Sequence, residues 1–320
     1  MKAIVVARPG DPEVLELREV QDPVAQRGEV RVRIHATAVN RADLLQRRGL
    51  YPAPPDAPAD IPGLEYAGVI DAVGEGVTGL AVGERVLGLA GGGTYAEQIV
   101  LPARTVVRMP EGLSFEDAAA LPEACITAFD AMVDQGGLSA GERVLIHAVG
   151  SGVGTAALQI AHALGATVVG TSRTASKLER ATALGLDKAV LAREPKFADA
   201  VGEVDLVLDL VGGAYVGESL RCLAPRGRHV LVGLTGGRTT ELDLGLLLRN
   251  RLRLFGTVLR ARPLEEKITA MQRFGKHVLP LVARGLVRPV VEQVLPLARA
   301  SEAHRQMEAD QSFGKLVLSC

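Results

Sequence analysis

The sequence predicts an α/β protein in which a β-rich domain accompanies a doubly wound parallel sheet with helices on both faces. Two observations carry this prediction. Strand-like segments separated by glycine and proline turns fill the first third of the chain, whereas strands and helices alternate between residues 143 and 260. Such alternation is typical of parallel strands connected by helices. With 320 residues, 48% of them apolar, the chain is long enough for two domains of ordinary size.

The first domain is expected to contain half-buried antiparallel strands over residues 1–8, 14–20, 29–39, 65–77, 84–90 and 95–110. Within 29–39, apolar residues alternate with Arg31 and Arg33, which predicts one buried side and one solvent-facing side. A short helix over 41–48 precedes residues 51–63, whose repeated prolines favour an extended loop.

A helical stretch from Phe115, interrupted at Pro122, marks the change of composition near which we place the domain boundary. Strands of the second domain are expected over residues 143–149, 166–171, 186–192, 204–213, 228–237 and 252–260. The tail from Pro263 returns to helix and then to two strands, 290–297 and 314–319. Because these strands have no neighbouring parallel repeat, we expect the tail to rejoin the first domain.

The composition excludes several classes of protein. Net charge is −1 with both signs interspersed, so we expect neither nucleic-acid nor membrane partners. The apolar run before Pro9 is too short for a signal peptide, and no run of 18 apolar residues occurs, which predicts a cytoplasmic protein. Cys125, Cys222 and Cys320 are scattered, so neither a disulfide framework nor a thiolate zinc site is expected.

A glycine-rich turn follows the first strand of the second domain and precedes helical spacing that starts at Thr155. The turn consists of Gly150, Ser151, Gly152, Val153 and Gly154. Glycines allow close backbone approach, and a helix N-terminus favours an anion, so we expect the turn to bind the pyrophosphate of a dinucleotide. The fingerprint G-x-G-x-x-G is not met, because position 155 is Thr, and an ordinary tight β-to-α turn is the alternative.

The end of the next strand indicates which dinucleotide is bound. NAD-binding units commonly place Asp or Glu there, whereas this chain has Thr171, Ser172 and Arg173, with Lys177 one helical turn further. Hydroxyl, guanidinium and ammonium groups suit a 2′-phosphate, which favours NADPH over NADH. The alternative is that Arg173 and Lys177 are solvated ends of a loop and a helix.

Segments spread along the whole chain carry a resemblance to a known family. They are residues 36–51, 82–89, 121–132, 146–161, 205–213, 227–234 and 303–318. In them the chain resembles the medium-chain dehydrogenase/reductase superfamily and, within it, the zinc-free quinone oxidoreductases related to ζ-crystallin. It is most similar to the tumour-suppressor-inducible quinone oxidoreductase subgroup.

The resemblance implies a GroES-like domain made of residues 1–122 and 263–320, and a Rossmann-like domain made of 123–262. It implies an active-site cleft where the two meet. It also implies a homodimer joined edge to edge through the strand at 252–259.

The same resemblance bears on metal and substrate. Zinc-dependent relatives carry an early Cys, a G-H-E motif and a four-Cys lobe, whereas these places read Asn40 and Gly63-Leu64-Glu65 here, with no Cys cluster. Without a metal Lewis acid, the substrate must accept a hydride unaided, which points to quinones or conjugated enones.

Candidate catalytic residues are few. Tyr51 matches a family position near the nicotinamide, where its hydroxyl would donate a proton or a hydrogen bond, or it packs against prolines. Ser151 would contact the carboxamide or a substrate oxygen, or is a small turn residue. Asn40 is expected at the substrate end of the cleft, and Asp43 is expected to orient backbone at the adjoining helix.

Other residues are implied to contact the cofactor or to support it. Gly233 and Leu259 should line the nicotinamide side, and Lys315 would reach the cofactor from the tail. Ala192 stands where close relatives carry a Tyr against the adenosine, which puts adenine stacking in doubt. His147 lies at the end of a strand, and a structural role is favoured over a direct one.

Three functions remain open from the sequence. The leading one is NADPH-dependent quinone reduction. The second is reduction of enones or enoyl thioesters, for which a basic patch at Arg47 and Arg48 would favour a CoA thioester. The third, from another class, is a non-catalytic NADPH-binding protein like the crystallins, or an RNA-associated one, which the net charge of −1 disfavours.

Overall fold

The computed structural model describes residues 1–320 as two compact units. Unit 1 comprises Met1–Glu123, Arg260–Ala283 and Pro289–Cys320, and unit 2 comprises Ala124–Leu259 and Arg284–Arg288. The domain bounds expected from the sequence, 1–122 with 263–320 and 123–262, stay a prediction about where the chain folds independently. None of the helices combines the length and the apolar character needed to cross a membrane.

Unit 2 is built on a six-stranded sheet in which every neighbouring pair is parallel, in the order β10-β9-β8-β11-β12-β13. The strands are β8 (Arg143–Ile146), β9 (Thr167–Ser172), β10 (Lys188–Leu191), β11 (Val204–Asp209), β12 (Leu223–Leu231) and β13 (Arg253–Gly256). The predicted doubly wound parallel sheet is confirmed. The last strand is shorter than the expected 252–260, and it lies at the edge of the sheet.

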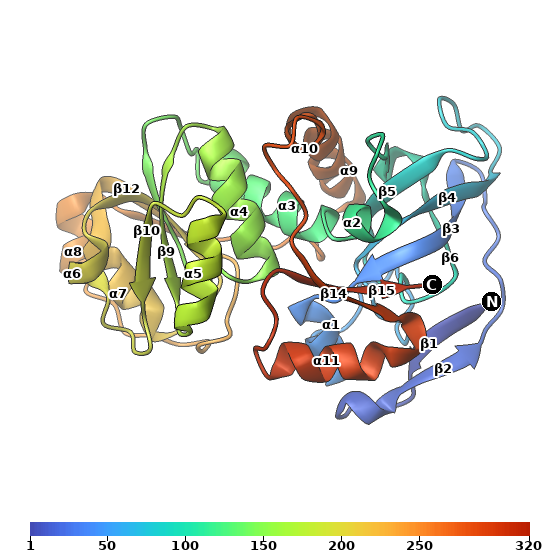
Figure 1. Cartoon of the computed structure of the whole chain (residues 1–320), viewed down its shortest axis with the longest axis horizontal. Helices are drawn as coiled ribbons and strands as arrows, with labels where there is room; N and C mark the ends of the chain where they lie inside the picture. The colour runs from blue at the N-terminus through green and yellow to red at the C-terminus, as the bar shows by residue number, and fades with distance from the viewer. The chain divides into compact units, whose positions relative to one another are not determined.

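Helices cover both faces of this sheet (Figure 1). Figure 1 shows α4 (Gly152–Ala163) and α5 (Ala175–Ala183) on one side, with α6 (Ala198–Val201), α7 (Ala214–Cys222) and α8 (Leu244–Asn250) on the other. Before the sheet come α3 (Pro122–Phe129), which begins in unit 1, and a π-helical segment, Asp130–Gln135. Gly165 ends α4 in the left-handed conformation, with φ +81°, as its position after the helical pattern predicts.

Unit 1 contains a hairpin and a seven-stranded sheet. The hairpin joins β1 (Lys2–Val6) to β2 (Leu15–Glu19). The sheet has the order β14-β15-β3-β4-β5-β7, and β6 pairs with β3. Its strands are β3 (Glu29–Ala38), β4 (Glu65–Val73), β5 (Arg85–Leu89), β6 (Gln98–Pro102), β7 (Val106–Arg108), β14 (Val291–Pro296) and β15 (Lys315–Ser319).

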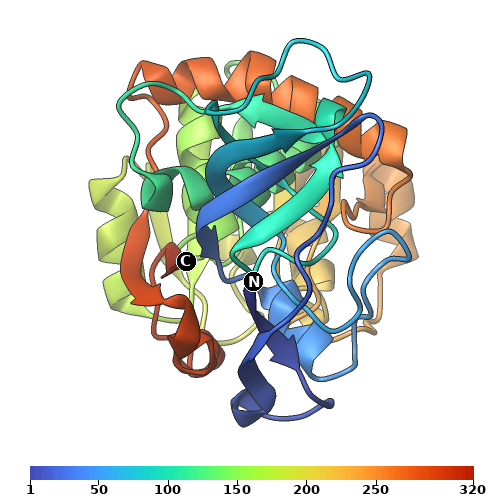
Figure 2. The ribbon, with the colours of Figure 1, turned by 90° about the vertical axis from the view of Figure 1, so that its right-hand side faces the viewer.

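The tail rejoins the first part of the chain, as predicted, because β15 pairs antiparallel with β3. The two chain ends therefore lie near each other in unit 1 (Figures 1 and 2). The helices of this unit are α1 (Arg41–Arg47), α2 (Phe115–Ala119), α9 (Leu264–Arg273), α10 (Leu279–Ala283) and α11 (Ala300–Glu308). A π-helical segment, Phe274–Val278, separates α9 from α10, and single 3-10 turns are formed by Pro12–Val14, Ala103–Thr105 and Leu297–Arg299.

Two segments of unit 1 show where the strand predictions are correct and where they are wrong. In β3 the even-numbered residues from Val30 to Ala38 are buried, while Arg31 and Arg33 are not, so the alternation predicted the buried side correctly. The strand expected over 95–110 is instead two strands separated by the 3-10 turn Ala103–Thr105. Pro102 ends β6, since proline has no N–H group to continue a ladder.

His147 follows β8 and is fully buried in unit 2. Its Nδ1 lies 2.8 Å from Thr171 Oγ1 and its Nε2 lies 2.8 Å from Ser219 Oγ. The Ser219 hydroxyl donates its one proton to the Tyr215 carbonyl, so it accepts a bond from the imidazole N–H. The Thr171 hydroxyl then donates to the other ring nitrogen. The ring is fully bonded in its neutral form, which supports the structural role favoured for it.

We predict that His147 makes folding sensitive to acid. Burial lowers the pKa of His147 to about 4 from its ordinary value near 6.5. The neutral ring therefore stabilises the fold above pH ~6.5, and this contribution, roughly 3 kcal/mol, is lost as pH falls toward 4. Between these values, urea unfolding of His147→Gln should show a shallower pH dependence than the wild type, by up to ~1.4 kcal/mol per pH unit.

The control for this prediction keeps the titrating ring. Thr171→Val removes one partner of His147, so it should lower stability at every pH while retaining most of the slope. Identical slopes for the wild type and His147→Gln would contradict the prediction.

Candidate functional site

The glycine-rich turn begins α4 earlier than predicted. Ser151 is the N-cap, its Oγ accepts a hydrogen bond from the Gly154 N–H at 3.1 Å, and Gly152–Ala163 is helical. The expected start at Thr155 is wrong, because a serine hydroxyl that caps the helix allows the three residues after it to adopt helical backbone. The first N–H groups of α4 consequently lie directly after the carboxyl end of β8.

Gly154 is required by the packing of α4 against the segment that follows β8. A Cβ at this position would lie 2.4 Å from the Ala148 carbonyl oxygen and 2.7 Å from backbone atoms of Val149. For Gly154 the structure therefore supplies a packing reason, close contact between the helix and the segment that follows β8. Gly150, Gly152, Val153 and Gly154 remain candidate phosphate contacts.

The residues after β9 lie at the same edge of the sheet. Ser172 is nearly buried, and its Oγ accepts a hydrogen bond from the Thr174 N–H at 3.1 Å, which shapes the loop into α5. Arg173 is exposed, and Lys177 is half-buried in the first turns of α5. The Thr171 hydroxyl lies 2.8 Å from the buried His147 ring, so it belongs to the interior of unit 2 rather than to a ligand site.

Gly233 and Leu259 follow β12 and β13, so they too lie beyond the carboxyl ends of parallel strands. A Cβ on Gly233 would lie 2.4 Å from the Leu210 carbonyl oxygen, and Leu259 is buried. In open α/β sheets, ligands bind outside the carboxyl ends of the strands. With the N-terminus of α4 and the cations after β9, this edge of unit 2 fits an anionic dinucleotide.

The adenine end of the expected site contains an aromatic ring that the sequence did not single out. Ala192 is buried, and its carbonyl oxygen accepts a hydrogen bond from the Tyr215 hydroxyl at 2.8 Å. Burial raises the pKa of Tyr215, and the positive charge of Arg173 opposes that rise, which places Arg173 within electrostatic range of the ring. Tyr215 lies on α7 and Ala192 directly follows β10, so only the fold relates them.

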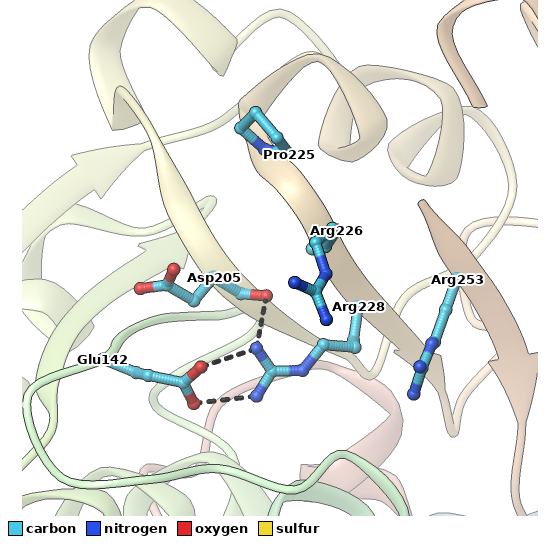
Figure 3. A pocket seen from close by; sticks show the side chains of 7 residues that line it. Glu142, Asp205, Pro225, Arg226, Arg228 and Arg253 are labelled. Carbon is cyan, nitrogen blue, oxygen red and sulfur yellow. Dashed lines mark hydrogen bonds and ion pairs between the residues drawn. The ribbon is translucent and has the colours of Figure 1, made fainter. Parts of the chain in front are cut away.

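A pocket of about 340 Å³ lies toward the opposite, amino end of the strands (Figure 3). Figure 3 shows Arg228 pointing at Glu142, with both guanidinium Nη atoms 2.7 Å from a carboxylate oxygen. Arg228 also donates to the Asp205 carbonyl at 3.3 Å. This bidentate pair joins the residue before β8 to β12. We therefore infer that the charged residues of this pocket stabilise the sheet and do not form a nucleotide site.

In unit 1, Asn40 and Lys315 meet at a buried ion pair with Glu65. The Lys315 ammonium lies 2.6 Å from Glu65 Oε1 and donates to Asn40 Oδ1 at 2.5 Å and to the Val39 carbonyl at 3.1 Å. The Asn40 amide donates to Glu65 Oε1 at 2.8 Å. All three ammonium hydrogens of Lys315 thus have acceptors within unit 1.

Asp43 orients the backbone around the start of α1, as expected. Its carboxylate accepts hydrogen bonds from the Asn40 N–H at 2.8 Å and from the Gly63 N–H at 3.1 Å. Burial raises the pKa of Asp43 to about 6, although these two backbone bonds act in the opposite direction. The group therefore joins the start of α1 to the segment that precedes β4.

Tyr51 is half-buried beneath a cation. The Arg260 guanidinium carbon lies 5.0 Å from the centre of the Tyr51 ring, and Arg260 donates to the Tyr51 carbonyl at 3.4 Å. Further bonds to the Gly91 carbonyl at 2.8 Å and to Gln46 Oε1 at 2.5 Å hold the guanidinium in place. Burial raises the pKa of Tyr51, and the positive charge of Arg260 opposes that rise.

The basic surface patch considered at Arg47 and Arg48 is wrong for Arg47, which does not lie at the surface. Arg47 is completely buried, where it pairs with Glu308, donates to the Gly10 carbonyl at 2.9 Å and lies 3.2 Å from His304 Nδ1. Arg48 is half-exposed and pairs with the same Glu308 carboxylate at 2.7 Å. Helical periodicity did not reveal that Arg47 points into the unit.

The donor set of the chain does not fit a zinc ion. No three His, Cys, Asp or Glu side chains are placed so as to hold a metal. At the positions compared with the zinc-dependent relatives, Asn40 and Glu65 bind the Lys315 ammonium instead.

Sequence reasoning missed Glu65, Glu123 and Arg260 as site residues. Glu123 stands in a Leu-Pro-Glu segment at the start of α3, and its backbone N–H donates to Glu65 Oε2 at 2.8 Å. A carboxylate beside a proline is common at the start of a helix. The Leu-Pro-Glu pattern therefore did not indicate that Glu123 lies next to the carboxylate of Glu65.

Comparisons with known proteins agree with this architecture. Residues 26–111 match the family described as alcohol dehydrogenase GroES-like domain, and residues 152–276 match the family described as zinc-binding dehydrogenase. The chain is 35% identical to a quinone oxidoreductase of Pseudomonas aeruginosa, with 99% of each chain covered. It is 39% identical to the polyketide synthase GfsB of Streptomyces halstedii, over 92% of this chain but only 5% of that protein.

Among solved structures, the chain is similar to a quinone oxidoreductase of Escherichia coli complexed with NADPH. The TM-score is 0.89 at 30% identity, and the match covers 100% of both chains. The predicted combination of a GroES-like domain with a Rossmann-like domain is thereby confirmed.

We predict that Gly154→Ala destabilises unit 2 by ~1–3 kcal/mol, because the new methyl group would overlap backbone atoms of the segment after β8. Binding of a nicotinamide dinucleotide should weaken in parallel, which fluorescence titration with NADPH would measure.

Gly217→Ala is the matched control, since it changes a helical glycine of the same unit whose nearest neighbour to a new Cβ is the Glu241 carbonyl oxygen at 3.2 Å. Alanine favours helix by up to ~1 kcal/mol over glycine, so this variant should fold and bind normally. Equal behaviour of the two variants would refute the packing role of Gly154.

Proposed function

The chain belongs to the medium-chain dehydrogenase/reductase superfamily, and on that premise we propose that it reduces quinones with NADPH, by direct hydride transfer without a metal ion. The observation that carries the proposal is its similarity, over 99% of both chains, to a protein named quinone oxidoreductase. The match to a quinone oxidoreductase complexed with NADPH supports the same substrate and cofactor. We also propose the zinc-free, ζ-crystallin-like subgroup and a cytoplasmic location.

The absence of a fitting donor set supports a metal-free reaction. Lys315 takes Asn40 Oδ1 and Glu65 Oε1, and the Glu123 N–H takes Glu65 Oε2, so these oxygens already have partners within unit 1. The substrate must then be electrophilic by itself, as quinones are.

In this proposal NADPH supplies a hydride from nicotinamide C4. The α4 N-terminus, from Gly150 to Gly154, holds the pyrophosphate, and Ser151 combines its cap with a contact to the carboxamide or the substrate. Gly233 and Leu259 border the nicotinamide. Lys315 would contribute only its positive charge to the cofactor site, because its ammonium hydrogens are directed to Glu65, Asn40 and Val39. Tyr51 donates a hydrogen bond to the substrate oxygen, and Asn40 shapes the substrate end.

The preference for NADPH is assigned to the segment after β9. Ser172, Arg173 and Lys177 offer a hydroxyl and two cations, whereas a carboxylate at this place would repel a 2′-phosphate. Arg173 lies at an exposed position after β9.

A homodimer through unit 2 is part of the proposal. The strand β13 is an edge strand, and an unpaired edge is a ready template for a second copy. On the neighbouring helix α8, Leu244 and Leu248 are 70% and 81% exposed, which is costly for leucine unless another surface covers them. If the chain sedimented as a monomer at micromolar concentration, the proposed homodimer would be wrong.

Reduction of enones or enoyl thioesters is the second candidate, favoured by the 39% identity to part of a polyketide synthase. The deciding experiment follows oxidation of NADPH and NADH with 1,2-naphthoquinone, 1,4-benzoquinone, an enone and crotonyl-CoA. Quinone turnover that exceeds the other rates supports the first proposal, and preference for crotonyl-CoA supports the second. No turnover with any of them would leave a non-catalytic NADPH-binding protein.

We predict that Lys177→Ala raises the KM for NADPH about tenfold, equivalent to ~1.4 kcal/mol, with little change for NADH. The reason is loss of a cation beside the 2′-phosphate, which NADH lacks. Steady-state kinetics with both cofactors measures the effect.

Lys188→Ala is the matched control, because Lys188 begins β10 at the amino edge of the same sheet. It should leave both KM values unchanged. Equal effects of Lys177→Ala on the two cofactors would show that the 2′-phosphate site lies elsewhere.

A further inference from the structure

Tyr215, in the first turn of α7, contacts residues at the carboxyl end of the sheet in unit 2. Its hydroxyl donates to the Ala192 carbonyl at 2.8 Å, and Ala192 directly follows β10. The centre of its ring lies 5.0 Å from that of His147, with the two ring planes at 85°. His147 directly follows β8, so the Tyr215 side chain contacts the carboxyl ends of two strands, β8 and β10.

The strand between β8 and β10 is β9. Both contacts of Tyr215 are themselves bonded to the end of this strand. The Ala192 N–H donates to the Ser172 carbonyl at 2.9 Å, and His147 Nδ1 lies 2.8 Å from the Thr171 hydroxyl. The Tyr215 ring therefore lies next to the carboxyl end of β9, where the segment proposed to bind the 2′-phosphate begins.

The Tyr215 ring is held in position before any ligand binds. Phe197, which is buried, packs against it with ring centres 5.1 Å apart and planes at 45°. The phenol hydrogen is used on the Ala192 carbonyl. Tyr215 itself is only half-buried, so part of its ring is accessible to solvent. A ring that is already fixed loses little conformational entropy when a ligand packs on it.

Residue 192, where the sequence left adenine stacking in doubt, presents no surface of its own. Ala192 is 1% exposed and belongs to the hydrophobic core that also contains Phe197. Tyr215 packs against the same core from α7. An aromatic surface is therefore present beside the end of β10, but it comes from another element of the chain.

A purine base is the ligand chemistry that fits this position. Ligands of open α/β sheets bind outside the carboxyl ends of the strands. In NADPH, adenine and the 2′-phosphate are attached to neighbouring carbons of one ribose. A 2′-phosphate bound by the segment from Ser172 to Lys177 consequently places the base near the end of β9, where Tyr215 lies. Aromatic side chains bind nucleobases by stacking, which is favourable for any base.

We propose that Tyr215 forms the wall of the adenine site, with its ring stacked on the base, and that Phe197 and His147 position this ring. This inference rests on the use of NADPH proposed above. The segment from Ser172 to Lys177 then selects the 2′-phosphate, whereas Tyr215 supplies affinity for the base, which NADPH and NADH share.

The first test is calorimetric titration of the full chain with adenosine 2′,5′-bisphosphate, NADPH and NADH. Tyr215→Leu removes the aromatic face and should raise the Kd of all three ligands about tenfold. Lys177→Ala should instead weaken only the two ligands that carry a 2′-phosphate. Wild-type affinity of Tyr215→Leu for all three ligands would overturn the inference.

Tyr215→Phe is the matched variant, because it keeps the ring and removes only the hydroxyl that bonds to Ala192. Its Kd values should rise by no more than about threefold. A tenfold loss in Tyr215→Phe would assign the effect to the hydroxyl and would contradict stacking. This variant also decides the question if Tyr215→Leu does not fold.

A second readout separates direct stacking from a purely structural role. The chain has four tyrosines and no tryptophan, and a base stacked on a phenol ring quenches its fluorescence. Saturating adenosine 2′,5′-bisphosphate should therefore quench the tyrosine fluorescence of the wild type. In Tyr215→Phe this quenching should be lost although calorimetry still detects binding.

Tyr66→Phe is the control for the fluorescence measurement. Tyr66 is completely buried in unit 1, and its hydroxyl has no hydrogen-bond partner. This variant should retain the quenching seen in the wild type. Equal quenching in the wild type and in Tyr215→Phe would show that the base binds elsewhere.

The two proposals fail in distinguishable ways. If the wild type reduces quinones with NADPH but Tyr215→Leu and Tyr215→Phe bind and quench as the wild type does, the adenine wall is wrong and the function stands. If the wild type binds NADPH without reducing quinones, the quinone assignment is wrong, and the titrations still decide the role of Tyr215. If the wild type binds none of the three nucleotides, both proposals are wrong.

Discussion

A single ammonium group organises unit 1. Lys315, at the start of the last strand, bonds to Glu65 at the start of β4 and to Asn40 just before α1, and Glu65 in turn binds the first turn of α3. Four segments that are far apart in the chain therefore meet at one buried charge pair. Removing one member of such a pair typically costs 3–5 kcal/mol, because the other charge is left buried and uncompensated.

This constraint links the fold to the chemistry. The Glu65 carboxylate of this pair accepts the backbone N–H of Glu123 at the start of α3, and Arg260 lies over the Tyr51 ring. The dinucleotide edge of unit 2 is built differently, from a serine-capped helix start, a glycine without room for a methyl group and cations after β9.

Sequence patterns predicted the parts of the fold that depend on neighbouring residues. Alternation in β3, the buried run of β8 and the left-handed Gly165 are visible locally because burial and backbone conformation repeat with the period of the element. The same reasoning misjudged the start of α4, since a cap depends on one hydroxyl rather than on a period. It also placed Arg47 at the surface, although the arginine is buried against Glu308 from the distant helix α11.

The sequence by itself determined the class of fold, the alternation of strands and helices along unit 2, the glycine turn with its following cations, and the identity of Tyr51, Ser151 and Asn40 as candidates. Only the tertiary structure decided that Lys315 is held by Glu65 and Asn40, that Gly154 serves packing, and that Glu123 stands beside a buried carboxylate. The physical reason is that strand and turn patterns arise from residues close in sequence. The protonation of a carboxyl group instead depends on burial and on charges that come from distant segments.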